Sequence, residues 1–342
     1  MSQILTGTIA QPKKRLNSRQ ITFLIFVVCL HTLPVVAVFT GARTIDGLVC
    51  IGFSLLYAFG LGGCLHRYFA HRAFKTSRAF QFFMCMLTGM TFGDPIWFAG
   101  KHRIHHKYSD TERDVHSPNQ GFWFCWFGSV ADEGYPEEEI LKHAADFTCY
   151  PELMWMHRNY WVTPVVVGVI TFLIGGFSMF AIGYGASIIV ALHMASGINY
   201  FCHKGNNRRY ETNDGSTNSL VMALLTFGEG WHNNHHHYPN TARAGFFWWE
   251  WDPVYYTLKV LAWTGLVWDV RGVPERVKYN LIEESNRRSP SSLPHVFSHS
   301  LNQLSPEDLA RSVFGNPVDK LDTLDSLVRR DALAHKVDDL VR

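Results

Sequence analysis

The chain has 342 residues, of which 47% are hydrophobic and 14% aromatic, and its formal net charge at pH 7 is only +2. This balance, with no basic and aromatic stripe, argues against a nucleic-acid-binding protein. The seven cysteines stand singly, without a C-x-x-C pair, which argues against a disulfide framework or a thiolate metal site and indicates mostly inert, buried thiols.

The N-terminal part of the chain predicts two membrane-spanning helices. Residues 1–20 carry four basic residues and no acid, and the apolar run behind them has no small-residue cleavage site. We therefore expect residues 1–20 to be a cytoplasmic segment under the positive-inside rule, and not a signal peptide. Residues 21–40 and about 46–65 each supply the roughly 20 apolar residues that cross a bilayer.

Residues 79–93 are uncharged but short for a span, and Asp94-Pro95 ends the run. If this segment crossed the membrane, the histidine-rich segments before and after it would lie on opposite faces and could not share a site. We therefore predict an interfacial or re-entrant segment here. Residues 107–158 are polar and rich in tryptophan, which favours a place in a cytoplasmic cap.

A second hairpin is predicted within residues 159–202, which contain no Lys, Arg, Asp or Glu and are too long for one span. Two spans, about 159–177 and 180–202, would turn near Gly175-Gly176. Both predicted hairpins then have their two ends in the cytoplasm, and residues 204–283 join the cap.

The composition changes after about residue 283. Residues 284–304 are rich in Ser and Pro and predict a linker. Ser305 and Pro306 suit the N-cap and the first position of a helix. Spaced Leu and Val residues then predict a weakly amphipathic helical tail, cytoplasmic like the cap, over residues 305–342.

The 18 histidines are the most unusual feature of the chain, and most of the central ones are clustered. By the parity of the spans, four groups lie on the cytoplasmic face: His66 and His71; His102, His105 and His106; Asn199 and His203; and His232, His235 and His236. The two H-x-x-H-H groups place three imidazoles on one helix face, because residues three and four apart are neighbours. His66 and His71 stand five apart, about 140° around an ideal helix. They would serve different ions, or one would lie where the helix frays.

This many imidazoles in one cap indicates a metal site, because neutral imidazole is the commonest metal ligand in proteins. All-imidazole ligation suits Fe, Zn, Cu or Ni. A structural zinc closes with four ligands, so the clustered set is too large for one zinc and fits two metals with open positions. Breaking an unactivated C–H bond in a lipid needs metal and O2 chemistry, which favours iron. The isolated His31, His157 and His193 are expected to be ordinary internal residues.

The segments HRYFAH, HRIHH and FGEGWHNNHH resemble the three histidine boxes of the membrane fatty-acid desaturases, specifically the Δ9 acyl-CoA desaturase branch. The resemblance covers roughly residues 20–280, so residues 21–283 are the predicted desaturase domain. It implies an all-α integral membrane fold, with four transmembrane helices in two hairpins and a helical cytoplasmic cap carrying a di-iron site. The implied metal ligands are His66, His71, His102, His105, His106, His203, His232, His235 and His236, with Asn199 acting through water. His237 is an extra residue in the third box and is left out of this set, and Cys125-Trp126 replace the Ser-His of many relatives.

The resemblance implies that O2 is the co-substrate and that a cis double bond, at Δ9, is introduced into a saturated long-chain acyl-CoA during fatty acid biosynthesis. It also implies a separate electron donor (ferredoxin, cytochrome b5 or a reductase), because no HPGG-type haem segment is present. An acyl-lipid desaturase and a related di-iron lipid hydroxylase remain open alternatives. A membrane metal transporter or sensor is disfavoured, because the histidines gather on one face of the membrane. The expected location is a bacterial inner membrane.

Ligating histidines usually donate their second N–H group to a carboxylate or a carbonyl. Asp94, Asp110, Asp114 and Glu229 lie near the boxes and are candidates for this role, the alternative being that they are ordinary solvated acids. The sequence does not identify the substrate-binding residues.

Overall fold

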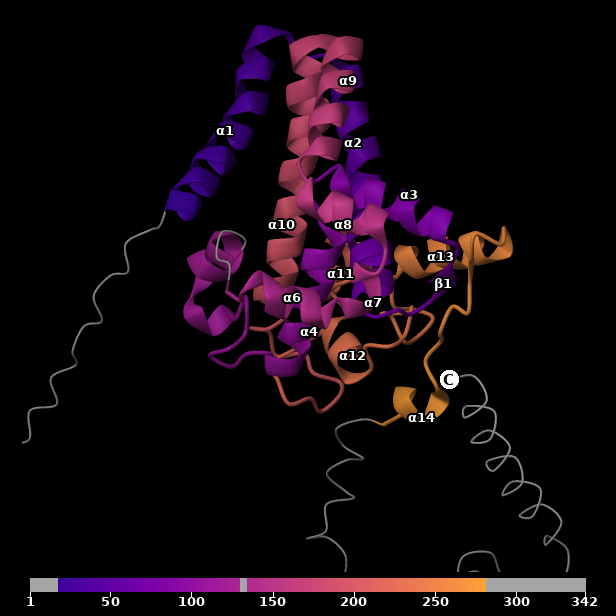
Figure 1. Cartoon of the computed structure of the whole chain (residues 1–342). Coiled ribbons are helices and arrows are strands. Elements are labelled where there is room, and N and C mark those ends of the chain that lie inside the picture. Colours follow the sequence, from indigo (N-terminus) through magenta and orange to yellow (C-terminus); the bar gives the residue numbers. More distant parts are fainter. Residues whose placement is uncertain (1–17, 130–133, 281–342) are drawn as a thin grey trace, which may run out of the picture. The chain divides into compact units, whose positions relative to one another are not determined.

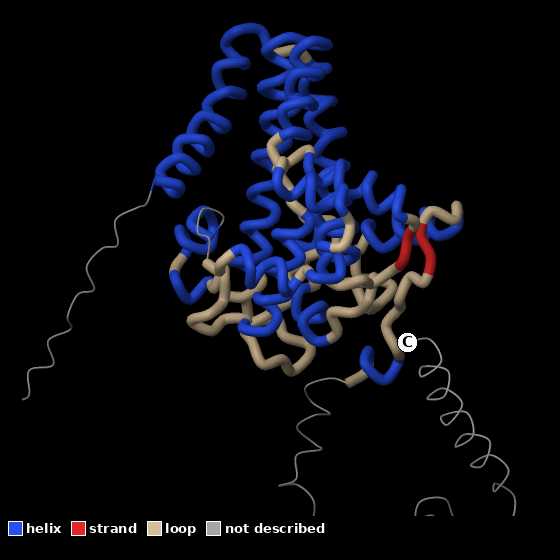
Figure 2. Tube along the Cα trace, viewed as in Figure 1, coloured by secondary structure: helices blue, strands red, loops and turns tan. Residues whose placement is uncertain are grey.

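The computed structural model describes residues 18–129 and 134–280 (Figure 1). The chain divides into two units, Met1–Ile282 and Glu283–Arg342, and every described residue belongs to the first. The predicted linker over 284–304, the predicted tail over 305–342 and most of the predicted N-terminal segment lie outside the described residues. The described part is mostly helical (Figure 2), and two short strands are its only departure from the predicted all-α fold.

Three helical runs are long and apolar enough to cross a membrane by length and composition: Ile21–Gly41, Thr44–Ala70 and Val162–Phe201. They comprise α1 (Ser18–Gly41); α2 (Thr44–Phe59) with the π-helix η1 (Gly60–Ala70); and α9 (Val162–Ser178), η4 (Met179–Gly185) and α10 (Ala186–Phe201). Only 17% of the most apolar part of the first and third runs is buried. Their apolar side chains therefore face outward, as they would toward lipid.

The third run folds back on itself at Gly176. This residue has φ 70° and ψ −164°, a conformation that glycine adopts without steric cost. Tyr184 Oη donates to the carbonyl of Pro164 at 3.0 Å, whereas twenty residues of straight helix would separate them by about 30 Å. The helices α9 and α10 therefore lie antiparallel, and the chain reverses where the sequence predicts a turn.

The turns of the two helical hairpins contact each other. Arg43, between α1 and α2, forms an ion pair with the buried Asp46 at 2.7 Å. The same guanidinium donates to the carbonyl of Gly175 at 2.5 Å, next to the reversal of the third run. This contact puts both turns at one end of the helices.

The segment that follows the first histidine box is too short to span a membrane. The helix α3 (Arg78–Gly89) has 12 residues, which is about 18 Å against a hydrocarbon thickness of about 30 Å. Ser77 caps it by accepting from Phe80 N, and Asp94 caps the next helix, α4 (Pro95–Tyr108), by accepting from Ile96 N. Pro95 takes the first helical position, where its missing N–H costs nothing.

Short helices make up the rest of the described chain: η2 (Pro118–Gln120), η3 (Phe124–Gly128), α6 (Glu137–His143), α7 (Ala145–Thr148), α8 (Pro151–Arg158), α11 (Leu220–Leu225), α12 (His232–His237), α13 (Pro253–Trp263) and α14 (Glu275–Lys278). The strands β1 (Lys75–Thr76) and β2 (Val267–Trp268) pair antiparallel, with Lys75 opposite Trp268. The largest buried cluster includes Phe69, Phe74 and Phe147. It joins the end of η1 to α3, α7 and α13.

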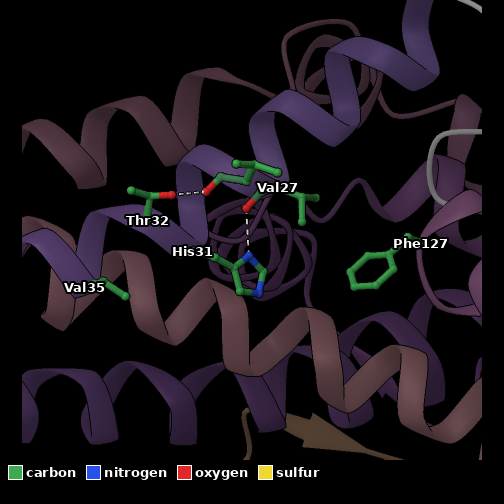
Figure 3. A pocket seen from close by; sticks show the side chains of 6 residues that line it. Val27, His31, Thr32, Val35 and Phe127 are labelled. Carbon is green, nitrogen blue, oxygen red and sulfur yellow. Dashed lines mark hydrogen bonds between the residues drawn. The ribbon is translucent and has the colours of Figure 1, made fainter.

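A pocket of about 430 Å³ lies between α1 and η3 (Figure 3) and is lined by Val27, Val28, His31, Thr32, Val35 and Phe127.

The isolated histidines His31 and His193 are joined by hydrogen bonds. Trp126 Nε1, which can only donate, bonds to His193 Nδ1 at 2.9 Å, so His193 must carry its proton on Nε2. His193 Nε2 then donates to His31 Nε2, with the two nitrogens 3.1 Å apart. His31 therefore carries its own proton on Nδ1, which donates to the carbonyl of Val27 at 2.7 Å. Both isolated histidines thus have partners within the fold, and none of the clustered histidines lines this pocket.

Candidate metal centre

Nine histidines converge into two groups. The five-histidine site consists of His66, His71, His102, His106 and His235. The four-histidine site consists of His105, His203, His232 and His236. Within each site the candidate ligand nitrogens all lie within 4.8 Å of one another. The structure therefore brings together all nine histidines that the sequence singles out, in two separate sites.

The helices α4 and α12 each contribute to both sites. The i, i+4 pair of α4, His102 and His106, points into the five-histidine site, while His105 turns to the other. The arrangement is reversed on α12, where His232 and His236 enter the four-histidine site and His235 crosses to the five-histidine site. Two similar sequence boxes thus contribute histidines to the two sites in opposite proportion.

His66 and His71 lie in the same site because their helix changes its pitch. The first histidine box falls in the π-helix η1 and the residue that follows it, where Nα–H of His71 bonds to the carbonyl of His66 at 3.2 Å, an i→i+5 contact. Residues five apart then lie on the same side of the helix. The geometry therefore places both histidines in one group and disfavours the alternative in which they serve different ions.

The distances between neighbouring imidazole nitrogens fit ligands of a common ion. In the five-histidine site, Nε2 of His66 and His235, of His235 and His106, and of His102 and His71 are each 2.9 Å apart. Two imidazole nitrogens bound at about 2.1 Å, at right angles on one ion, would stand about 3.0 Å apart. Nε2 of His232 is likewise 3.0 Å from Nε2 of His203 in the four-histidine site.

Carboxylates bind the outer Nδ1–H groups of several of these rings and so turn the Nε2 lone pairs toward the centre of each site. His105, His203 and His236 donate from Nδ1 to Asp114 at 2.9 Å, Asp110 at 3.0 Å and Asp214 at 2.6 Å. His66 Nδ1 bonds in the same way to Glu229. A proton held on Nδ1 leaves Nε2 as a free acceptor, and Nε2 of His105 is buried without a hydrogen-bond partner. An inward-facing, unprotonated nitrogen is what a metal ion requires.

Three of the four acids that the sequence proposes for this role accept from a clustered histidine: Asp110, Asp114 and Glu229. The fourth, Asp94, does not, because its carboxylate caps α4 and accepts from His157 Nδ1 at 2.5 Å. Asp214 takes this role instead. Nothing in the sequence pointed to it, because it lies in a polar loop well before the third box.

The protonation states also favour metal binding. Burial, and then the neighbouring His203, lower the pKa of His105 to about 3, and the pKa of His235 lies well below its ordinary value for the same kind of reason. Burial disfavours the charge of Glu229, but Arg67 and then His66 outweigh it and lower its pKa to about 2. Neutral imidazoles and ionised carboxylates therefore coexist at neutral pH, which is the state that binds a cation.

A buried ion cluster holds Glu229 in place. Arg67 Nη2 contacts Glu229 at 2.7 Å and Asp252 at 2.9 Å, and all three side chains are almost fully buried. Asp252 also caps α13 by accepting from Tyr255 N at 3.0 Å. The first box, the third box and α13 are thereby tied together around His66.

The side-chain amides of the two asparagines in the third box bind α12 to neighbouring segments. Asn233 Oδ1 accepts from the backbone N of Arg209 and Tyr210, each at 2.8 Å. Asn234 Oδ1 accepts from Asn218 Nδ2 at 2.8 Å. Both asparagines are fully buried, so they fix the direction in which the neighbouring histidines point.

Three further residues lie close to the sites. Asn199 is half-buried on α10, one turn before His203, and its side chain makes no hydrogen bond within the described residues. His237 stacks on Tyr210, with ring centroids 4.3 Å apart, and belongs to neither site. His116, which the sequence did not single out, lies against His105 with the rings tilted and their centroids 4.1 Å apart, and its ring groups with His105 and Asp114.

The donor set fits two transition-metal ions. Five and four imidazoles without a thiolate suit Fe, Zn, Cu or Ni, and two neighbouring sites of this size exceed what a closed structural zinc site requires. Carboxylates behind the ligands are a regular feature of catalytic metal sites.

Comparison with known proteins identifies relatives over most of the chain. The family model described as fatty acid desaturase matches residues 46–268. An acyl-CoA C20 Delta5-desaturase of Anemone leveillei is 33% identical over 267 residues, which cover 77% of this chain and 85% of the relative. An icosanoyl-CoA 5-desaturase of Limnanthes douglasii is 34% identical, covering 80% and 78%. An sn-1 stearoyl-lipid 9-desaturase of Anabaena variabilis is 32% identical, covering 65% and 84%.

Proposed function

Because the chain belongs to the fatty acid desaturase family, and is thus an oxidoreductase of lipid metabolism, we propose that it introduces a cis double bond at Δ9 into a saturated long-chain acyl-CoA. The reaction would consume the acyl chain, O2, two electrons and two protons, and would give the monoene and two waters. The observation that supports this most directly is the pair of neighbouring all-histidine sites, each with its nitrogens about as far apart as ligands of one ion.

The nine histidines would hold two irons, and Asn199 would add a ligand through a water. Bound iron supplies the O2 chemistry that an unactivated C–H bond requires. The protein's own part is positional: Asp110, Asp114 and Asp214 hold the outer ring protons and keep the inner nitrogens free. Burial of His66, His105, His203, His232 and His235 would limit the access of water to the reaction.

The topology proposed for the chain is four spans in two hairpins, with the metal sites on the cytoplasmic face. The reversal at Gly176 supports it, as does the contact of Arg43 with Gly175 at the far end of the helices. Short helices outside the spans expose large apolar side chains, for example Phe83 on α3, Leu224 on α11 and Trp263 on α13. These side chains suit the bilayer surface. A bacterial inner membrane remains our prediction for the location.

The substrate form is the least constrained part of the proposal. The printed names of the relatives include acyl-CoA and acyl-lipid desaturases, at positions 5 and 9. We favour acyl-CoA and Δ9 because the histidine boxes resemble that branch. A separate electron carrier would deliver the two electrons.

The test is a fatty-acid profile by gas chromatography and mass spectrometry, with the double bond localised, in host cells that express the chain. Wild type is expected to produce a new cis-9 monoene, and His235→Ala is expected to lose it, because His235 lies in the five-histidine site. His237→Gln is the matched control. It changes the second next residue on the same helix, outside both sites, and should retain product.

Each other outcome contradicts a defined part of the proposal. A hydroxy acid in place of the monoene would indicate the hydroxylase alternative, and a bond at another carbon would contradict Δ9. Feeding isotopically labelled stearoyl-CoA to isolated membranes separates the substrate forms. Labelled oleate is expected first in the CoA pool, and its first appearance in glycerolipids would indicate an acyl-lipid desaturase.

A further inference from the structure

The four-histidine site is surrounded by three carboxylates. Asp110, Asp114 and Asp214 each accept Nδ1–H from one of its histidines, at distances between 2.6 and 3.0 Å. Each also accepts a backbone N–H group: that of Gly215 on Asp110 at 2.6 Å, that of Asp110 on Asp114 at 2.8 Å, and that of Ser216 on Asp214 at 3.0 Å. In the described part of the chain, the only ion pairs of these acids are with histidines.

The five-histidine site has far less negative charge around it. Of its histidines only His66 donates to a carboxylate, that of Glu229, and this carboxylate is shared with the guanidinium of Arg67. Within residues 18–129 and 134–280, no carboxylate accepts a hydrogen bond from the remaining four. The guanidinium of Arg103, which donates to the carbonyl of Ala70 at 2.8 Å, is paired with Asp146 at 2.6 Å and therefore adds no net charge near this site.

This difference in charge would change the reduction potential of a metal ion bound in each site. A carboxylate on the outer nitrogen makes an imidazole a stronger donor, and fixed negative charge in a buried site stabilises the more positive ion. Hydrogen bonding and burial around the ligands are among the levers by which proteins set metal reduction potentials. Both donor sets consist of imidazoles, so the difference in fixed charge between the two sites comes from the residues behind the ligands.

We propose, resting on the two-iron function above, that the two irons are electronically unequal. The iron of the four-histidine site loses an electron first, and the iron of the five-histidine site is the last to leave the ferrous state. In the fully oxidised centre, the first electron from a donor is therefore held at the five-histidine site. The aspartates thus set the order in which the pair accepts its two electrons.

The experiment uses the purified full chain, loaded with ⁵⁷Fe, reduced anaerobically with dithionite and then oxidised stepwise with ferricyanide, which takes one electron per molecule. Mössbauer and EPR spectroscopy follow the irons. Two separate one-electron steps are expected, with half of the iron ferric and half ferrous between them. A single step in which both irons oxidise together would overturn the inference.

Variants assign each step to a site. Asp214→Asn removes one negative charge behind His236, so it should raise the potential of the first iron oxidised and reduce the excess of the mixed-valence state about tenfold, or about 59 mV for one electron. Asp110→Asn should do the same and covers the case in which Asp214→Asn fails to fold. Glu229→Gln should instead raise the potential of the second step. Movement of the second step by both aspartate variants would overturn the assignment.

Failure of this inference can be told from failure of the proposed function. A chain that takes up no iron, or forms no monoene, contradicts the proposed function and the inference that rests on it. A chain that makes the monoene but oxidises in one step contradicts the inference alone.

Discussion

Two aspartates close to the histidine boxes differ in what they hold. Asp214 accepts from His236 at 2.6 Å and is itself fixed by Ser216 N at 3.0 Å. Asp94 accepts from His157 and caps α4, and it contacts neither site. The role of each acid therefore follows from which N–H group reaches it, and not from its distance along the chain to a box.

These contacts predict that the same substitution, Asp to Asn, affects iron binding at Asp214 and not at Asp94. Asp214→Asn is expected to weaken iron binding about 10–100-fold, the usual loss when a hydrogen-bond partner of a metal ligand is removed. Asp94→Asn is expected to leave iron binding unchanged, because Asn caps a helix about as well as Asp. The measurement is the iron retained by each purified protein after dialysis against a graded series of chelator concentrations.

Asp94→Asn serves as the matched control, since it makes the same chemical change at an acid near a different box. Equal iron retention by the two variants would contradict the role given to Asp214. Loss of iron from Asp94→Asn alone would restore the prediction made from the sequence.

At the level of single residues, the i, i+3 and i+4 spacing predicts the clustering of six histidines in the two H-x-x-H-H groups, and the resemblance to the desaturases implies His66, His71 and His203. Their division between two ions could not be predicted. His105 and His235 turn to the opposite site from their helix neighbours, which depends on how α4 and α12 pack together. Asp214 was missed for the same reason, since tertiary packing alone brings its loop to His236.

Among the elements, the π-helix η1 packs closely against the third histidine box at Gly62. A Cβ atom placed on Gly62 would stand 2.7 Å from Glu229 Oε1 and 3.2 Å from Val254 Cγ2. Glu229 cannot move away freely, because Arg67 and His66 both hold it. The absence of a side chain at Gly62 is what lets this carboxylate reach His66.

Gly62→Ala is therefore expected to destabilise the protein by about 1–3 kcal/mol, a typical cost of overpacking, and to lower its iron content. Gly60→Ala, two residues earlier in η1, would have its Cβ 3.9 Å from the nearest side chains and should be tolerated. Thermal unfolding in detergent and iron analysis measure the two effects. Similar losses in both variants would show that η1 tolerates no alanine, and would contradict the specific role of Gly62.

The helices themselves were largely readable from apolar runs, but the change of pitch in η1 was not. An ideal α-helix separates His66 and His71 by about 140°, so the sequence did not decide whether the two histidines share a site. The i→i+5 contact between them removes that separation. No composition signal marks a π-helix, because it is stabilised by the tertiary packing around it.

For the molecule as a whole, the two hairpins predict the side of the membrane on which each turn lies. In a background without the seven native cysteines, Thr44→Cys and Ile174→Cys should react with an impermeant maleimide on intact spheroplasts. Glu138→Cys, exposed on α6, should react only after permeabilisation. Thr44 lies beside the first turn and Ile174 just before the second, and the contact of Arg43 with Gly175 places the turns together.

The labelling pattern tests the membrane orientation and the second hairpin separately. The reverse pattern at all three positions would invert the orientation and contradict the cytoplasmic placement of the metal sites. Different behaviour of Thr44→Cys and Ile174→Cys would contradict the second hairpin itself.

The reversal near Gly176 could be predicted at this scale, because a charge-free stretch of that length holds two spans and the paired glycines offer a turn. The contact between the turns could not, because the sequence shows Arg43 and Asp46 only as two charges between apolar runs and does not show what they contact. In the fold Asp46 is fully buried and directs the guanidinium toward Gly175.

The exchange of histidines between α4 and α12 couples the two sites mechanically. An ion in the five-histidine site would hold His102 and His106 of α4 and His235 of α12. It would thereby also order His105, His232 and His236, their neighbours on the same two helices, before a second ion binds. The first ion would bear the entropy cost of ordering both helices, and the second would bind to ligands that are already aligned. We therefore expect metal loading to be cooperative, so that a molecule that loses one ion holds the other less tightly.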